Sequence, residues 1–145
     1  MISQSPSKVR LGRLLWLGPL TILASILGVL TVRVLAVAIL HPDPAPISLG
    51  WAMPTLFTLV LVTGAVLVFA LVARFAKNPI RSYQIIALVF LLLSFLPDIG
   101  FAQSSMPGAN WPNAIALMIM HVVAWAICVT MLAKLSTSDS QKGES

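Results

Sequence analysis

Charged side chains are scarce in this sequence of 145 residues, since Asp, Glu, Lys and Arg together make up only 9% of it. Soluble domains carry about a quarter charged residues and about half apolar ones. Here 59% of the residues are hydrophobic, and the mean hydropathy is +0.99. The composition therefore excludes a soluble domain and predicts a membrane protein.

Residues that bind metals or act as nucleophiles are also few. One cysteine, two histidines and four carboxylates rule out an internal disulfide and make a tetrahedral metal site unexpected. The chain has no GxxxxGK[ST] phosphate loop and no HExxH, CxxC or GxSxG motif. We therefore expect no metal and no other cofactor, and we assign no catalytic residue.

Long apolar runs are what the sequence does contain. A hydrocarbon core of about 30 Å requires about 20 apolar residues in a helix, and four runs meet this requirement: residues 14–40, 51–74, 79–97 and 112–134. Short connections make consecutive helices antiparallel neighbours, so we predict an all-α membrane protein, an antiparallel up-down four-helix transmembrane bundle. Residues 1–135 form this single domain, and the polar residues 136–145 are expected to be a disordered cytoplasmic tail.

Local signals indicate where these helices begin and how they meet. Asn78 and Asn110 stand at N-cap positions, each followed by a proline in the first helical turn. Gly28 and Gly64 are narrow points at which helix backbones can approach closely, as packing in lipid requires. Cys128 is expected to be a buried thiol. The first run is longer than the apolar region of a cleavable signal peptide, so we expect it to remain as a span.

The basic residues predict the orientation in the membrane. Eight of the nine flank the termini and the middle connection: Lys8, Arg10, Arg13, Arg74, Lys77, Arg81, Lys134 and Lys142. The positive-inside rule then predicts a multi-pass protein of the cell membrane with both termini cytoplasmic. This cationic rim favours anionic lipids of the inner leaflet. We expect no nucleic-acid partner, because the basic residues follow the membrane surface.

Arg33 is the ninth basic residue, and it interrupts the first apolar run. It lies seven residues before the end of that run, about 10 Å below the outer surface at 1.5 Å per residue. A charge there is costly unless the side chain reaches the headgroups or faces a partner inside the bundle. Asp98 and His121 lie in the same outer half of the predicted bundle, and Ser94 and Thr55 occupy helix faces there.

Two interpretations of these residues follow. In the first, Arg33, Asp98, His121, Ser94 and Thr55 line an outward-facing polar pocket that binds a ligand. In the second, Arg33 and Asp98 form a structural ion pair, His121 is a neutral interior histidine, and the hydroxyls bond their own helix backbones. A cavity open to the outside would favour the first interpretation, and tight packing would favour the second.

The sequence resembles a family of small bacterial four-span membrane proteins of unknown function. The resemblance rests on VRVLAVAIL at residues 32–40, NPIRSYQIIALVFLLLSFLPDI at residues 78–99 and MHVVAWAI at residues 120–127. It implies a four-helix fold and no particular reaction.

The sequence favours a non-enzymatic role over an enzymatic one. We expect a small-ligand or lipid-binding bundle, or an accessory bundle that forms a homo-oligomer or joins a larger membrane partner. One alternative is a small membrane enzyme or quinone-linked redox protein that uses His121 as an acid and base. An oligomeric transporter is the third, although one chain of four spans without an inverted repeat is small for transport.

Labelling tests the predicted orientation. A cysteine introduced near either terminus, in a Cys128→Ser background, should react with a membrane-impermeant maleimide only after the membrane has been opened. Reaction of either terminus in intact cells would contradict the orientation.

Overall fold

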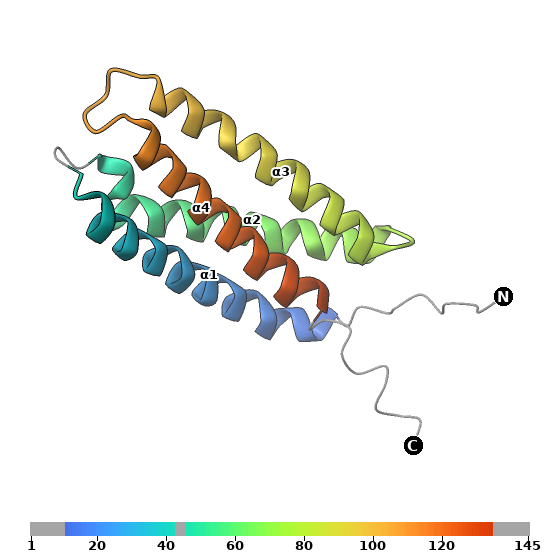
Figure 1. Cartoon of the computed structure of the whole chain (residues 1–145). Helices are drawn as coiled ribbons and strands as arrows, with labels where there is room; N and C mark the ends of the chain where they lie inside the picture. The colour runs from blue at the N-terminus through green and yellow to red at the C-terminus, as the bar shows by residue number, and fades with distance from the viewer. Residues whose placement is uncertain (1–10, 43–45, 135–145) are drawn as a thin grey trace.

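The computed structural model describes residues 11–42 and 46–134 of the chain. It contains four long helices: α1 (Leu11–Leu40), α2 (Ala52–Phe75), α3 (Pro79–Ala102) and α4 (Trp111–Cys128) (Figure 1). A short 3-10 helix, η1 (Ile47–Leu49), precedes α2, and a π-helical segment, η2 (Val129–Lys134), continues α4. Each long helix packs mainly on the helices before and after it in the order α1, α2, α3, α4, and α4 also packs on α1, so that the four helices form a closed bundle. The predicted antiparallel four-helix bundle is confirmed.

All four helices are long and apolar enough to cross a membrane. The shortest of these spans has 23 residues, more than the about 20 that a hydrocarbon core requires. The chain is therefore a multi-pass membrane protein. The tail at residues 136–145 lies outside the described residues, so the expectation that it is disordered stays a prediction.

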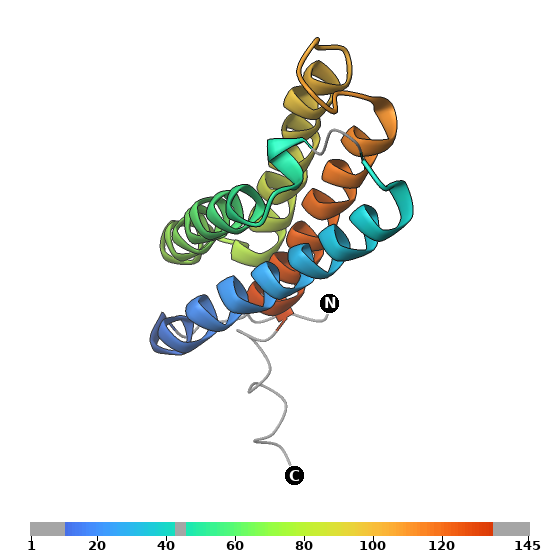
Figure 2. The same cartoon turned by 90° about the vertical axis from the view of Figure 1, so that its left-hand side faces the viewer.

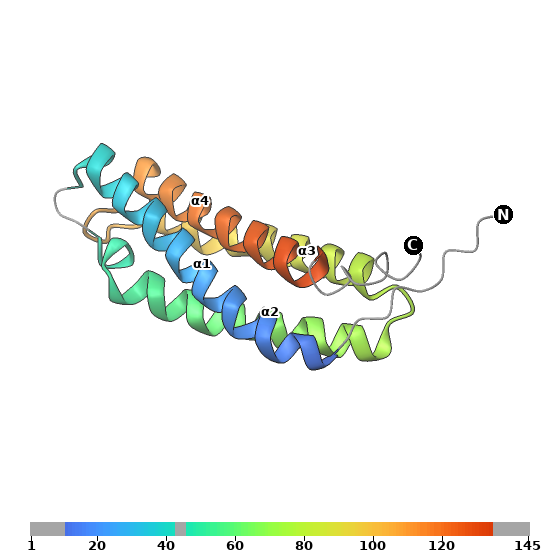
Figure 3. The ribbon, with the colours of Figure 1, turned by 90° about the horizontal axis from the view of Figure 1, so that it is seen from below.

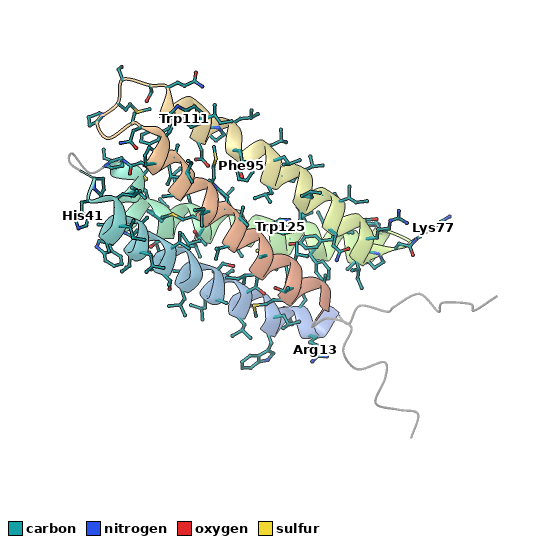
Figure 4. The ribbon with its side chains drawn as sticks, in the orientation of Figure 1. Arg13, His41, Lys77, Phe95, Trp111 and Trp125 are labelled. Atoms are coloured by element: carbon teal, nitrogen blue, oxygen red, sulfur yellow. The ribbon has the colours of Figure 1, made fainter. Side chains whose placement is uncertain are left out.

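The two ends of the bundle differ in charge. The connections α1–α2 and α3–α4 lie at one end, which we call the loop end (Figure 1). The start of α1, the α2–α3 turn and the end of η2 lie at the other, which we call the basic end because Arg13 and Lys77 are found there (Figure 4). Which end faces the cytoplasm stays a prediction.

The predicted helix caps have different outcomes. Asn110 caps α4, because its side chain accepts a hydrogen bond of 2.8 Å from the backbone N–H of Asn113. Asn78 occupies the predicted N-cap position of α3, but its side chain forms no capping hydrogen bond. The predicted position is therefore correct, and the predicted capping is wrong. Helix α3 also continues through Pro97 to Ala102, beyond the predicted end at residue 97. In a membrane, neighbouring groups can satisfy the carbonyl that a proline leaves unpaired.

Helix α1 crosses the bundle obliquely. It starts beside α2 at the basic end and finishes beside α4 at the loop end (Figures 2 and 3). Two clusters of buried side chains follow this course. Near the basic end, Leu14 packs with Phe69, Tyr83 and Leu132, and the rings of Phe69 and Tyr83 meet edge to face at 5.0 Å. Toward the loop end, α1 packs on α4 and η1 through Val29, Met120 and Leu49.

Gly28 marks the close approach of α1 and α4. A Cβ at this position would lie 2.8 Å from Cδ1 of Ile127 and 3.0 Å from Cγ1 of Val123. At Gly64, by contrast, an added Cβ would meet no atom within 4 Å. Only the first of these two glycines is therefore required for packing within the bundle.

Replacing these glycines tests the packing. Gly28→Leu should lower the free energy of unfolding by about 2 kcal/mol, because the added side chain overpacks the α1–α4 contact. Gly64→Leu is the matched control, and it should leave stability unchanged or raise it slightly, because leucine is the better helix former. Unfolding of the purified protein in mixed micelles by a denaturing detergent measures both. Equal losses in the two variants would contradict the close approach.

Candidate functional site

Arg33 is bound by the segment that enters α2. Its Nε–H donates a hydrogen bond of 2.9 Å to the backbone carbonyl of Leu49, the last residue of η1. Its guanidinium carbon lies 3.7 Å from the centre of the Trp51 ring, the geometry of a cation–π contact. Because Arg33 is half-buried, these contacts hold the charge at the edge of the bundle.

The side chain of Leu49 fixes η1 from the other direction. Only 2% of Leu49 is exposed, and it packs against Val29 of α1 and Met120 of α4. The backbone of η1 closes one turn, with the Gly50 N–H donating to the Ile47 carbonyl. The carbonyl that accepts from Arg33 is therefore held in place by a buried apolar side chain on the same residue.

Asp98 and His121 form the contact between α3 and α4. Nδ1 of His121 lies 3.0 Å from Oδ2 of Asp98, with 30% of the His121 side chain and 8% of the Asp98 side chain exposed. The distance is that of an ion pair, but the two atoms lack the angular geometry of a hydrogen bond. The attraction is therefore ionic when His121 is protonated.

The predicted ion pair between Arg33 and Asp98 is wrong. Within residues 11–42 and 46–134, the ion-pair partner of Asp98 is His121, and Arg33 instead bonds Leu49 and stacks on Trp51. The pairing of Arg33 with Asp98 was predicted because the two residues lie at similar depth along their helices. Depth says nothing about the direction in which a side chain leaves its helix. That direction determines which residue pairs with Asp98.

Ser94 and Thr55 bond their own helices. The Ser94 hydroxyl donates to the Leu91 carbonyl at 2.6 Å, and the Thr55 hydroxyl donates to the Trp51 carbonyl at 2.8 Å. Their hydroxyl protons are thus already used, as the structural interpretation expected. The structure brings Asp98 and His121 together but leaves Arg33, Ser94 and Thr55 in separate local contacts. Ligand binding by these five residues stays a prediction.

One open hollow in the described part of the chain lies away from these residues. It has a volume of about 290 Å³ and lies along α1. Its lining residues are mainly apolar: Leu27, Leu30, Thr31, Val34 and Leu35. None of the five predicted site residues lines it.

Several polar groups that sequence reasoning did not assign lie in the interior. Thr21 and Ser25 of α1 are fully buried, and the Ser25 hydroxyl lies 3.9 Å from the sulfur of Cys128, whose predicted burial is confirmed. Trp125 follows His121 by one turn, and its indole nitrogen is buried (Figure 4). His121, Trp125 and Cys128 are spaced four and three residues apart on α4, so they share one helix face, and this spacing was the available signal.

Comparison with known proteins adds the family. A model described as a family of unknown function, DUF6069, matches residues 6–138. No curated protein and no solved structure matches the chain.

A double-mutant cycle tests the contact between α3 and α4. Asp98→Asn and His121→Gln should each destabilise the bundle, with a coupling free energy of about 1 to 2 kcal/mol between them. Arg33→Gln combined with Asp98→Asn is the control pair, and these two changes should be additive because the residues share no partner. Unfolding free energies in micelles at a pH that keeps His121 protonated measure both cycles. Strong coupling in the control pair would contradict the assignment of partners.

Proposed function

Because the chain belongs to the DUF6069 family of unknown function, we propose a role from its geometry: a non-enzymatic accessory membrane protein that assembles with other chains. The observation that carries this proposal is the contact between Asp98 and His121. These two groups, the best candidates for acid–base chemistry in the sequence, are used to join α3 to α4.

The other polar groups at the loop end support the same proposal. A ligand site brings a few polar groups together around a concave surface. Here the hydroxyls of Ser94 and Thr55 bond their own helices. The hollow on α1 is lined by other, mainly apolar residues. The hydroxyls of Ser94 and Thr55 therefore act within the bundle, and an accessory role needs no further polar site.

A second candidate function rests on the same contact. A carboxylate 3.0 Å from an imidazole can orient a histidine that acts as a general base. With 30% of its side chain exposed, His121 is accessible to an amphipathic substrate such as a quinone. This arrangement supplies the second residue that sequence spacing alone did not provide.

The mass of the native particle tests the accessory role. The protein, extracted together with its surrounding lipid by a polymer, should contain at least two chains in fixed stoichiometry, either copies of itself or one other membrane protein. Native mass spectrometry and chemical crosslinking in intact membranes measure this. A single chain surrounded by bulk lipid in both measurements would overturn the proposal.

The same particle distinguishes the second candidate function. A quinone that co-purifies with the native protein and is lost in His121→Gln, with the helical content unchanged, would favour the redox role. Asp98→Asn is the companion variant, because it keeps the imidazole and removes the carboxylate. The accessory role predicts no such bound molecule in any of the three proteins.

A further inference from the structure

We infer that the guanidinium of Arg33, held in place by the Leu49 carbonyl and the Trp51 ring, binds the phosphate group of a phospholipid in the leaflet at the loop end. This inference is independent of the accessory role, because it rests on Arg33 and not on the contact between Asp98 and His121. Three observations support it: the level of the guanidinium along the bundle, the N–H donors of Arg33 that have no partner in the described residues, and the charge of the surrounding residues.

The level of Arg33 is set by α2 rather than by the end of α1. From Leu11 to Arg33, helix α1 rises about 33 Å, and α2 is about 36 Å long at the same rise per residue. The two helices run antiparallel between the same two ends of the bundle (Figure 1). The guanidinium, stacked on Trp51 just before α2 begins, therefore lies at the membrane interface, since a hydrocarbon core is only about 30 Å thick.

This level corrects the depth expected from the sequence. Counting back from Leu40 placed Arg33 within the acyl chains, but α1 is the longest helix and extends beyond the start of α2. Trp51, which is 59% exposed, has the amphipathic ring that is enriched at membrane interfaces. Phosphate groups of lipids are concentrated at the same level.

Arg33 retains most of its hydrogen-bonding capacity. A guanidinium carries five N–H donors in a planar fork, and the structure uses the one on Nε, which donates to Leu49. The four donors on the two Nη atoms have no partner within residues 11–42 and 46–134. Leu49 and Trp51 hold the plane of the fork in position, and such a fork matches the oxygens of a phosphate.

The surrounding charge favours an anion. Arg33 is the only Lys or Arg between residues 14 and 73, and residues 82–133 have none, so no other Lys or Arg competes for the anion at the loop end. Asp98, the carboxylate in the described part of the chain, is occupied by His121. Arg33 has no carboxylate partner within residues 11–42 and 46–134, and a cation partly shielded from water by an indole ring attracts phosphate more strongly than a fully solvated one does.

Native mass spectrometry of the full chain, in nanodiscs of phosphatidylcholine with phosphatidylglycerol, tests the site. The wild-type protein should retain one phosphatidylglycerol more tightly than the rest. Arg33→Gln should weaken that retention roughly tenfold, the scale of losing charge-assisted hydrogen bonds. Arg81→Gln, which removes an exposed cation of the basic end, is the matched control: it should weaken only the general attraction of that end for phosphatidylglycerol and keep this most tightly held lipid. Equal loss in both variants would overturn the site.

Further variants distinguish lipid binding by Arg33 from a purely structural role of its contacts. Trp51→Leu keeps the charge but removes the stacking ring, so it should weaken retention while the helical content by circular dichroism stays unchanged. Asp43 lies outside the described residues, and Asp43→Asn should leave retention unchanged. A large rise in Asp43→Asn would show that this carboxylate occupies Arg33 instead and would overturn the proposal. Displacement of the lipid by millimolar inorganic phosphate would also overturn it, in favour of a soluble anion.

Discussion

Every polar group inside a bilayer must find its partner within the protein, because the hydrocarbon offers none. This constraint accounts for more of the structure than any single contact. It makes the four apolar runs helices, whose backbone groups bond one another. It also explains why Thr21, Thr31, Thr55 and Thr63 each donate their hydroxyl proton to a carbonyl one turn earlier.

Groups that cannot be satisfied within their own helix connect different parts of the fold. Asp98 and His121 join α3 to α4, and Arg33 joins α1 to the segment before α2. Leu49 contributes one polar and one apolar contact. Its carbonyl accepts a hydrogen bond from Arg33, and its side chain packs between α1 and α4. The oblique course of α1 brings it beside α4 toward the loop end (Figures 2 and 3), where Leu49 packs against both helices.

Much of the fold and less of the candidate site could be predicted from the sequence. Hydropathy alone located the four spans, and the burial of Cys128 followed from its place in an apolar run. The partner of Asp98 could not be found in this way. Arg33 and His121 both lie in the loop-end half of the bundle, so depth did not distinguish between them, and the direction of each side chain depends on how the helices are rotated and tilted.

The sequence by itself determined the membrane class, the number of spans and their antiparallel order, because about 20 apolar residues are needed to cross a bilayer and short connections force neighbours together. Only the tertiary structure decided which polar groups meet. The crossing of α1 over the bundle brings α1 and α4 together at Gly28. Arg33 then bonds the Leu49 carbonyl of η1, and Asp98 pairs with His121. Such crossings depend on side-chain packing between helices distant in sequence, and no local pattern encodes them.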